Sequence, residues 1–330
     1  MTPQIHRNPP FRAEHLGSLL RTRELLDAKT AFEDSQLSES DLTVIEKKYI
    51  QDIVKKQKEL GYVALFDGEY CRHKAKSVKL TIAAPNWYHL RYKEGSAYPK
   101  DIYASDEEYF ADIATAYQEE LKILYEAGCG NVQFDDPNLA YFYSEKMLDG
   151  WKADPLNIRS ADDLFAEYIK LYNSLLSNRP ADFHIGAHIC RGNFVGSRHF
   201  SEGGYNRIAR RLFRELNVDT YYLEYDTPRA GGFEPLKELS TYKNVIFEVV
   251  TSKFPELEDN DETKTRIYVA AQFIADGNDI TIDAALNQIG ISPQCGFASH
   301  REGNSIDYVG MINKLKLVRE IANEVWPGQS

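Results

Sequence analysis

Apolar, β-rich stretches alternate along the whole chain with longer stretches whose apolar positions repeat at helical spacing. This alternation is typical of a parallel sheet whose strands are joined by crossover helices. Eight stretches have the composition of strands, and they begin near residues 14, 61, 77, 130, 182, 220, 244 and 287. Eight such strands predict an α/β protein with a (β/α)8 TIM barrel, formed by residues 1–330 as a single domain.

The stretches between the strands carry the signals of helix ends. Ser40 opens a long amphipathic stretch that stops at Gly61, and Ser105 precedes another that has acids in its first turn and Gly128 at its end. Serine is a favoured N-cap, acids suit the positive end of the helix dipole, and glycine is favoured just after the last turn. We therefore expect helices here, with residues 31–60 and 84–105 as additions to the barrel.

Composition and charge narrow the classes of function. With 43% hydrophobic and 12% aromatic residues, the 330-residue chain can build a sizeable core. Its net charge of -11 argues against nucleic-acid binding, because phosphates attract an excess of Lys and Arg. The N-terminal segment MTPQIHRNPPFRAEH lacks the apolar stretch of a signal peptide, and no apolar run is long enough for a membrane span. These features predict a cytoplasmic protein with no membrane partner.

The four cysteines, Cys71, Cys129, Cys190 and Cys295, lie far apart in the sequence. Disulfides are rare in the cytoplasm, and a chain of this size does not need them for stability. The cysteines are therefore expected to be buried free thiols or metal ligands.

Polar residues stand where nearly every predicted strand ends. These residues are Ser18, Asp67, Glu69, Asp135, Asp136, His188, Cys190, Glu224, Asp226 and Cys295. Active sites of β/α barrels lie at the carboxyl ends of the strands. Solvated turns alone would carry Gly, Asn, Ser and Lys, so thiols, an imidazole and carboxylates in these places indicate a functional site.

Two of these residues form the core of a predicted metal site. Within residues 182–190, side chains alternate between the two faces of the strand, so His188 and Cys190 point to the same face. Zn²⁺ accepts both imidazole nitrogen and thiolate, and Cys295 and Glu224 are the best-placed further ligands. The alternative is a core histidine, buried thiols and an ordinary ion pair. A structural zinc site would show close Cys-x-x-Cys pairs, which the sequence lacks.

The ligand set predicts a class of chemistry. Two thiolates and a carboxylate leave a Zn²⁺ site with a formal charge of about -1, which makes the ion a poor activator of water. Such an ion can instead hold a substrate thiol as a nucleophilic thiolate at neutral pH. Alkyl transfer to sulfur is therefore favoured over hydrolysis.

The chain contains, in this order, the segments RAEHLGSLLR, FDGEY, VQFDDP, HICRGN, YLEYD and SPQCG. Together they resemble the catalytic barrel of cobalamin-independent methionine synthase and its short single-barrel relatives, from about Phe11 nearly to the end. The resemblance implies one zinc cofactor, held by His188, Cys190, Glu224 and Cys295. It also implies that the zinc-bound sulfur of homocysteine accepts a methyl group.

The same resemblance implies that Ser18, Glu69 and Asp135 bind the amino-acid end of homocysteine. A hydroxyl and backbone N–H groups suit a carboxylate, and two carboxylates suit an ammonium group. Taken alone, Ser18 is equally well interpreted as a turn residue, Glu69 as a solvated strand end, and Asp135 as part of the cap before Pro137.

The chain also departs from the family pattern. The family carries Asp-x-His-Ser after the seventh strand, with the histidine proposed to transfer a proton, whereas this chain has Thr251 and Ser252 in the segment VVTSK. His15 is a weak candidate to face the pocket instead, although a core or surface histidine is the simpler interpretation. Arg191, Asn193 and Arg229 are candidates for binding an anionic group, and a loop salt bridge or turn is the alternative for each.

The predicted function is zinc-dependent methyl transfer to a small-molecule thiol, with homocysteine as the preferred acceptor and methionine as the product. The chain is too short for the second barrel of long methionine synthases, so the donor stays open between a methylated folate, a methyl-corrinoid protein and another methylated compound. Homo-oligomers are compatible with this prediction. The alternatives are a zinc-dependent alkyltransferase or lyase for another thiol, a metal-free decarboxylase-type barrel, and a binding protein with structural zinc.

Overall fold

The computed structural model describes residues 12–15, 17–62, 65, 79–90, 92–93, 95–194, 196–298 and 303–329. Its sheet has the strands β1 (Leu80–Ala83), β2 (Asn131–Asp135), β3 (His184–Ile189), β4 (Thr220–Glu224), β5 (Asn244–Val250) and β6 (Ile289–Pro293). All neighbours pair in parallel, and the strands follow one another in the order β1 to β6. These strands are the third to eighth of the predicted series.

The first predicted strand also joins this sheet. Ala13 forms a parallel bridge with Ile291 of β6, and the Glu14 N–H donates to the Ile291 carbonyl (2.9 Å). The Glu14 carboxylate lies 2.8 Å from the ammonium of Lys79, which directly precedes β1. The segment beside β6 therefore approaches β1, as closure of a barrel requires. The second predicted strand, from residue 61 to residue 69, lies mostly outside the described residues.

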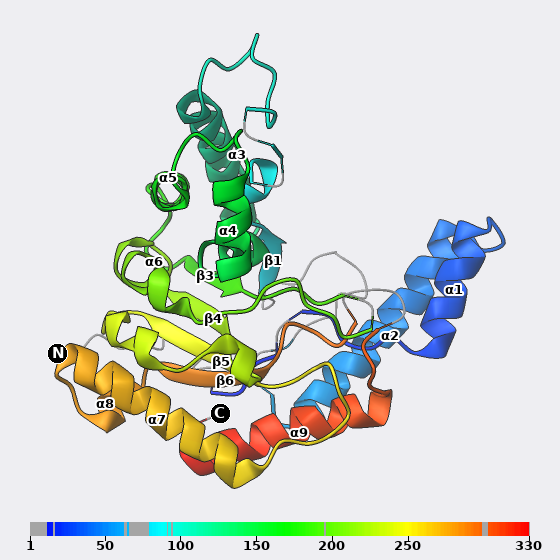
Figure 1. Ribbon diagram of the computed structural model, residues 1–330. Helices are drawn as coiled ribbons and strands as arrows, with labels where there is room; N and C mark the ends of the chain where they lie inside the picture. Colours follow the sequence, from blue (N-terminus) through cyan, green and yellow to red (C-terminus); the bar gives the residue numbers. More distant parts are fainter. Residues whose placement is uncertain are drawn as a thin grey trace.

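In the view of Figure 1, one set of helices lies above the sheet and another lies below it. They are α1 (Arg23–Glu33), α2 (Glu39–Glu59), α3 (Asp106–Glu126), α4 (Glu145–Ala153), α5 (Ala161–Leu175), α6 (Ala209–Glu215), α7 (Asn260–Asn278), α8 (Ile282–Leu286) and α9 (Tyr308–Val325). Short 3-10 segments are η1 (Pro85–Tyr88), η2 (Pro137–Phe142), η3 (Tyr205–Arg207), η4 (Pro228–Ala230) and η5 (Glu234–Glu238). Among the described residues, no helix is both long and apolar enough to cross a membrane.

The helix ends follow the capping signals, with one correction. Ser105 caps α3 by accepting a hydrogen bond from the Glu108 N–H, and Gly128 follows the helix with a φ of 87°. However, α2 begins earlier than predicted, because the Ser38 hydroxyl, not that of Ser40, accepts from the Asp41 N–H (3.1 Å). The helices α1 and α2 contact each other and extend away from the sheet as a pair (Figure 1).

The sheet brings its carboxyl ends together at one end of the molecule. β2 ends at Asp135, β4 ends at Glu224, and Cys190 directly follows β3. Glu224 is the register partner of Glu248 on β5. Because parallel neighbours share a direction, side chains that are distant in the sequence meet at this end.

Candidate metal centre

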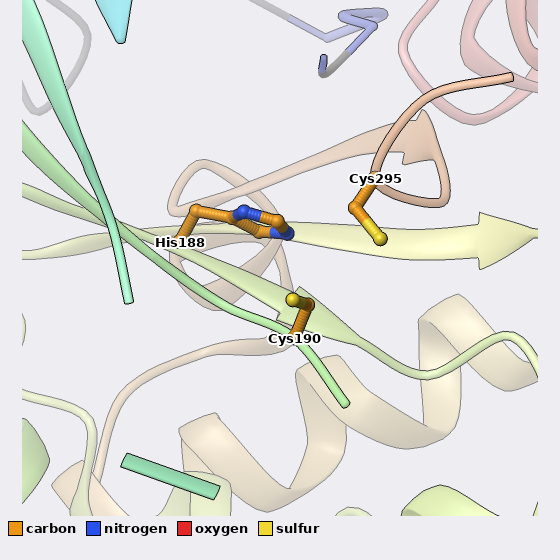
Figure 2. A group of neighbouring side chains, drawn as sticks. All are labelled: His188, Cys190 and Cys295. Carbon is orange, nitrogen blue, oxygen red and sulfur yellow. The ribbon is translucent and has the colours of Figure 1, made fainter. Parts of the chain in front are cut away.

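His188, Cys190 and Cys295 converge at the carboxyl ends of the strands. Each offers a ligand atom within 4.8 Å of those of the other two, and all three residues are buried. His188 and Cys190 come from β3 and the residue after it, whereas Cys295 comes from the loop after β6 (Figure 2). The alternation along β3 therefore places two donors on one face as predicted, and the sheet adds the third.

The loop that carries Cys295 packs against the segment that contains Ser18. Gly17 has a φ of 65°, and a Cβ there would lie 2.8 Å from the Cys295 carbonyl oxygen. The Phe297 N–H donates to the Ser18 carbonyl (2.7 Å). The Ser18 hydroxyl is buried and has no hydrogen-bond partner in the part of the chain that is described. Ser18 thus lies beside the thiol site, and its binding role stays a prediction.

Carboxylates adjoin both nitrogens of His188. The Asp135 Oδ1 lies 2.6 Å from Nδ1, and the Glu248 Oε1 lies 2.9 Å from Nε2. Burial lowers the pKa of His188, but the charges and hydrogen bonds of Glu248 and Asp135 outweigh it and hold this pKa well above its usual value. Since Asp135 interacts with Nδ1, the other ring nitrogen, Nε2, is available to an ion. An ion that binds there must displace the proton on Nε2.

The two thiols are close enough to interact. A hydrogen bond with Cys190, together with burial, raises the pKa of Cys295 well above its usual value. Cys129, Cys190 and Cys295 are all free cysteines. An imidazole and two thiols, flanked by buried carboxylates, form a donor set that Zn²⁺ accepts. The residues present therefore fit a zinc ion, whose binding would require deprotonated thiols.

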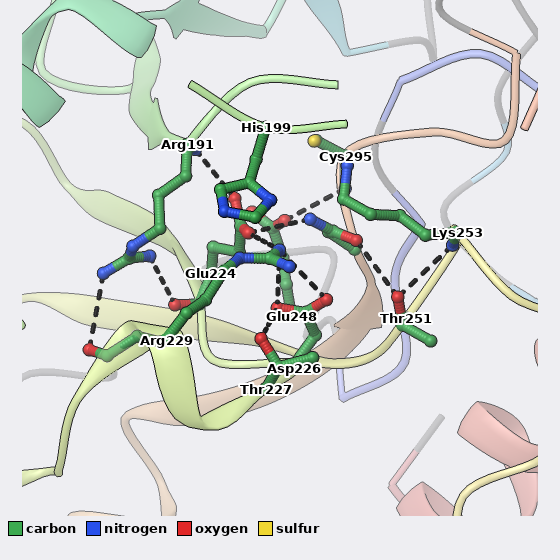
Figure 3. Close-up of polar contacts among 12 residues, drawn as sticks. Arg191, His199, Glu224, Asp226, Thr227, Arg229, Glu248, Thr251, Lys253 and Cys295 are labelled. Atoms are coloured by element: carbon green, nitrogen blue, oxygen red, sulfur yellow. Dashed lines mark hydrogen bonds and ion pairs between the residues drawn. The ribbon is translucent and has the colours of Figure 1, made fainter. Parts of the chain in front are cut away.

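Glu224, the predicted fourth ligand, is fully buried but is not one of the three donors that lie within 4.8 Å of one another. Its Oε2 accepts from the Arg191 N–H (2.8 Å), and its Oε1 accepts from Gln294 Nε2 (2.8 Å) and from Arg229 (Figure 3). Burial raises the pKa of Glu224, but the charges of Arg229 and Arg191 outweigh it and lower this pKa. Glu224 is thus held as a carboxylate that already has three N–H donors.

Glu248 was missed by the sequence analysis. Its side chain is buried, with Oε1 near His188 and Oε2 accepting from the Cys295 N–H (3.0 Å). Burial raises the pKa of Glu248. The sequence signal was an acid inside the otherwise apolar segment NVIFEVV of β5, a position where an unpaired carboxylate is costly.

The arginines considered as anion-binding residues make internal contacts. The Arg191 guanidinium lies 5.0 Å and 4.7 Å from the ring centres of Tyr143 and Tyr205, and it donates to the Glu224 carbonyl (2.9 Å). Arg229 pairs with Glu224 and with Asp226, 3.1 Å away. For Arg229 the structure supports the salt-bridge alternative, whereas the Arg191 guanidinium is held by loop carbonyls and tyrosine rings.

Thr251 lies directly after β5, where the family resemblance implies a histidine in related proteins. Its hydroxyl lies 3.3 Å from Gln294 Oε1 and accepts from the Lys253 N–H (3.3 Å). The buried Lys253 ammonium donates to the Gly192 carbonyl and to Asn193 Oδ1 (both 3.2 Å). Thr251 and Lys253 therefore hold the loops around the thiols, and Asn193 also donates to the Gly296 carbonyl (2.8 Å).

The remaining predicted residues differ in their positions. His15 is buried with its ring centre 5.9 Å from that of Tyr62, and burial together with the charge of Lys79 lowers its pKa to about 3. It is therefore a neutral core histidine at pH 7. Asp135 is half-exposed and lines the pocket, whereas Glu69 lies outside the described residues.

A pocket of about 550 Å³ opens above the thiols. Its described lining consists of Trp87, Leu90, Asp135, Pro137, Asn138, Tyr141, Met147, His188, Cys190, Gly192, Asn193, Phe194, Phe200 and Cys295. Mostly apolar walls with a few convergent polar groups are typical of small-molecule sites. The candidate metal donors thus lie in the wall of a pocket that a small molecule can enter.

Comparison with known proteins gives matches over most of the chain. The family model described as cobalamin-independent synthase, catalytic domain, matches residues 94–323. The uncharacterized protein YxjH of Bacillus subtilis (strain 168) is 33% identical over 378 residues, which cover 97% of this chain and 96% of YxjH. A methionine synthase of Pyrococcus furiosus is 24% identical over 68% of this chain and 53% of its own length.

Two solved structures share the fold. One is a putative vitamin-B12 independent methionine synthase from Listeria monocytogenes, with a TM-score of 0.72 and 26% identity over 97% of this chain and 99% of that one. The other is a B12-independent methionine synthase from Shewanella sp. W3-18-1, with a TM-score of 0.65 and 15% identity over 96% and 97% of the two chains. These matches confirm the predicted barrel fold and the family resemblance.

Proposed function

Because the chain belongs to the family of cobalamin-independent synthase catalytic domains, we propose that it is a zinc-dependent methyltransferase acting on a small-molecule thiol. Homocysteine is the proposed acceptor and methionine the product. The observation that supports this most directly is the convergence of His188, Cys190 and Cys295 in the wall of a pocket. The whole range 1–330 is proposed to act as a single barrel domain.

The proposed zinc site consists of His188, Cys190 and Cys295, with Glu224 as the carboxylate. When bound, zinc would lower the pKa of a substrate thiol, so that the thiol is a thiolate at neutral pH. Asp135 orients the imidazole through Nδ1, and the Cys295 loop is held by its contacts with Gly17. The protein's part is to fix the donors before the substrate arrives.

Ser18, Asp135 and Glu69 are proposed to bind the amino-acid end of the acceptor. The Ser18 hydroxyl is the group available to a carboxylate, and the half-exposed Asp135 is the one available to an ammonium. Asp135 would then serve both the acceptor and His188, linking substrate position to the metal site.

The donor is proposed to contact the aromatic part of the pocket. Trp87, Tyr141, Phe194 and Phe200 line it, and the Phe200 ring centre lies 6.1 Å from that of Phe194 and 6.2 Å from that of Tyr141. Such walls suit a flat or apolar group. A methylated folate and a methyl-corrinoid protein remain the donors to test, and product analysis with other thiols separates methyl transfer from a lyase reaction.

The test compares the wild type with Cys295→Ser and with a matched control, Cys129→Ser. Cys129 is also a free cysteine, but it lies just before β2 at the opposite end of the sheet, with its thiol donating to the Asn131 carbonyl (3.4 Å). Zinc content is measured by plasma mass spectrometry, and methionine formation from homocysteine is measured with each donor.

We expect one zinc ion per chain in the wild type and in Cys129→Ser, with methionine formed by both. Cys295→Ser should lose the zinc and the activity together, while circular dichroism shows an unchanged fold. Zinc and turnover retained in Cys295→Ser, or a wild type that takes up no zinc on reconstitution, would overturn the proposal.

A further inference from the structure

Two glutamates lie side by side at the metal centre, although only one was predicted. Glu224 and Glu248 are register partners on β4 and β5, and their side chains are both fully buried. They lie close together beneath the Cys295 loop (Figure 3). A pair of neighbouring buried carboxylates is stable only if each finds positive charge or N–H donors.

The two carboxylates have different partners. Glu224 has a guanidinium partner, Arg229, and accepts two further N–H groups. Glu248 accepts one backbone N–H, that of Cys295, and its other oxygen lies 2.9 Å from His188 Nε2. In the described part of the chain, no Lys or Arg nitrogen forms a salt bridge with Glu248.

The partner of Glu248 is the nitrogen that an ion would occupy. Asp135 holds Nδ1 of His188, so Nε2 is left to bind a metal. Glu248 Oε1 faces this same nitrogen, so the carboxylate lies where it could reach an ion bound to Nε2.

We propose that Glu248 is a carboxylate ligand of the metal centre, in addition to the residues implied by the family resemblance. Zinc can take a fifth ligand, and atoms that share one ion must lie near each other, as Nε2 of His188 and Oε1 of Glu248 do at 2.9 Å. The other oxygen of Glu248, Oε2, already accepts a hydrogen bond from the Cys295 N–H, so this side chain is joined to the loop that carries Cys295.

This inference rests on the proposed zinc site, and its experiment separates the two. Wild type, Glu248→Gln and Glu248→Asp are compared, with Asp219→Asn as the control. Asp219 is also a carboxylate that accepts hydrogen bonds, but it precedes β4 and lies at the opposite end of that strand from Glu224. Zinc affinity is measured by competition with a chromophoric chelator, and the visible absorption of the Co²⁺-loaded protein reports the ligands.

We expect Glu248→Gln to weaken zinc binding by more than about 100-fold, beyond what loss of an outer partner usually causes. Its Co²⁺ bands should shift, because a ligand atom is lost rather than a nearby charge. Glu248→Asp keeps the charge but shortens the side chain, so it should show the same changes. Asp219→Asn should leave both measurements unchanged.

The other possible results separate failure of the Glu248 inference from failure of the proposed function. A Glu248→Gln protein with wild-type cobalt bands overturns the inference while leaving the zinc site intact. If the wild type binds neither zinc nor Co²⁺, the proposed function itself fails. Thermal unfolding of the metal-free proteins checks folding, and if Glu248→Gln does not fold, the Glu248→Asp spectrum decides the question.

Discussion

The two ends of the barrel bury charge in different ways. At the amino ends of the strands, bases are enclosed by fixed partners. Arg12 donates to the carbonyls of Leu286 (3.1 Å) and Ile289 (2.8 Å), and its guanidinium lies 5.3 Å from the ring centre of Trp326. Lys243 donates in the same way to the Tyr221 hydroxyl (3.2 Å).

At the carboxyl ends, donor atoms instead converge on one point. His188, Cys190 and Cys295 face one another, and Glu248 lies against the imidazole. A hydrogen bond with Cys190, together with burial, raises the pKa of Cys295, and burial raises the pKa of Glu248, so both groups ionise less readily here than in water. The amino ends of the strands therefore stabilise the barrel, while the carboxyl ends are arranged for a ligand.

The largest stability effect is expected from Arg179→Ala at the amino end. Arg179 binds both oxygens of Asp219 and the Phe183 carbonyl, so its removal leaves a partly buried carboxylate without its base. The free energy of unfolding should fall by about 2 to 3 kcal/mol, measured by urea denaturation. Zinc content should not change.

Arg214→Ala is the control for that experiment. Its ion pair with Glu238 lies on the surface, and its loss should cost less than about 1 kcal/mol. If Arg179→Ala lost its zinc but kept its stability, the division of roles between the two ends would be wrong.

A smaller effect on stability is expected from the protonation of His15, a histidine that burial keeps neutral near the carboxyl ends of the strands. Its pKa is about 3 in the folded protein and about 6.5 when unfolded. The unfolded chain therefore takes up a proton first as the pH falls below 6.5, and stability is lost toward pH 3. Between pH 7 and pH 5, this residue should cost the metal-free protein about 2 kcal/mol.

His15→Gln removes the titrating group, so its unfolding free energy should fall less between pH 7 and pH 5 than that of the wild type. His199→Gln is the matched control, because His199 is partly exposed and pairs with Glu202 on the surface. Equal pH dependence in wild type and His15→Gln would show that His15 is not held neutral by burial.

The smallest stability effect is expected from Gly17→Ala. Gly17 lies where the N-terminal segment packs against the loop that carries Cys295. The positive φ of Gly17 and the 2.8 Å approach to the Cys295 carbonyl should cost about 1 to 2 kcal/mol. Zinc affinity should also fall, since Cys295 must shift. Gly150→Ala in α4 meets no atom within 4 Å and should be neutral or stabilising, so an equal loss in both variants would contradict this account.

Local patterns in the sequence were sufficient to locate much of the site. Alternation along β3 placed His188 and Cys190 on one face, and the rule that barrel sites lie at strand carboxyl ends identified Cys295. The first prediction depends only on the geometry of one strand, and the second depends on a property of the whole fold. Ser105 was likewise predicted as a cap from its neighbours, whereas the start of α2 was placed two residues too late because Ser38 and Ser40 carry the same capping signal.

Patterns in the sequence predicted the barrel, the end of it where polar side chains gather, and three side chains that converge there. Which charges meet follows from the folded chain: Arg229 pairs with Glu224, Asp135 with His188, and Glu248 accepts a hydrogen bond from the Cys295 N–H. Side-chain periodicity fixes the face on which a residue lies, but the partner of a buried charge depends on register and distance between strands that are far apart in the chain.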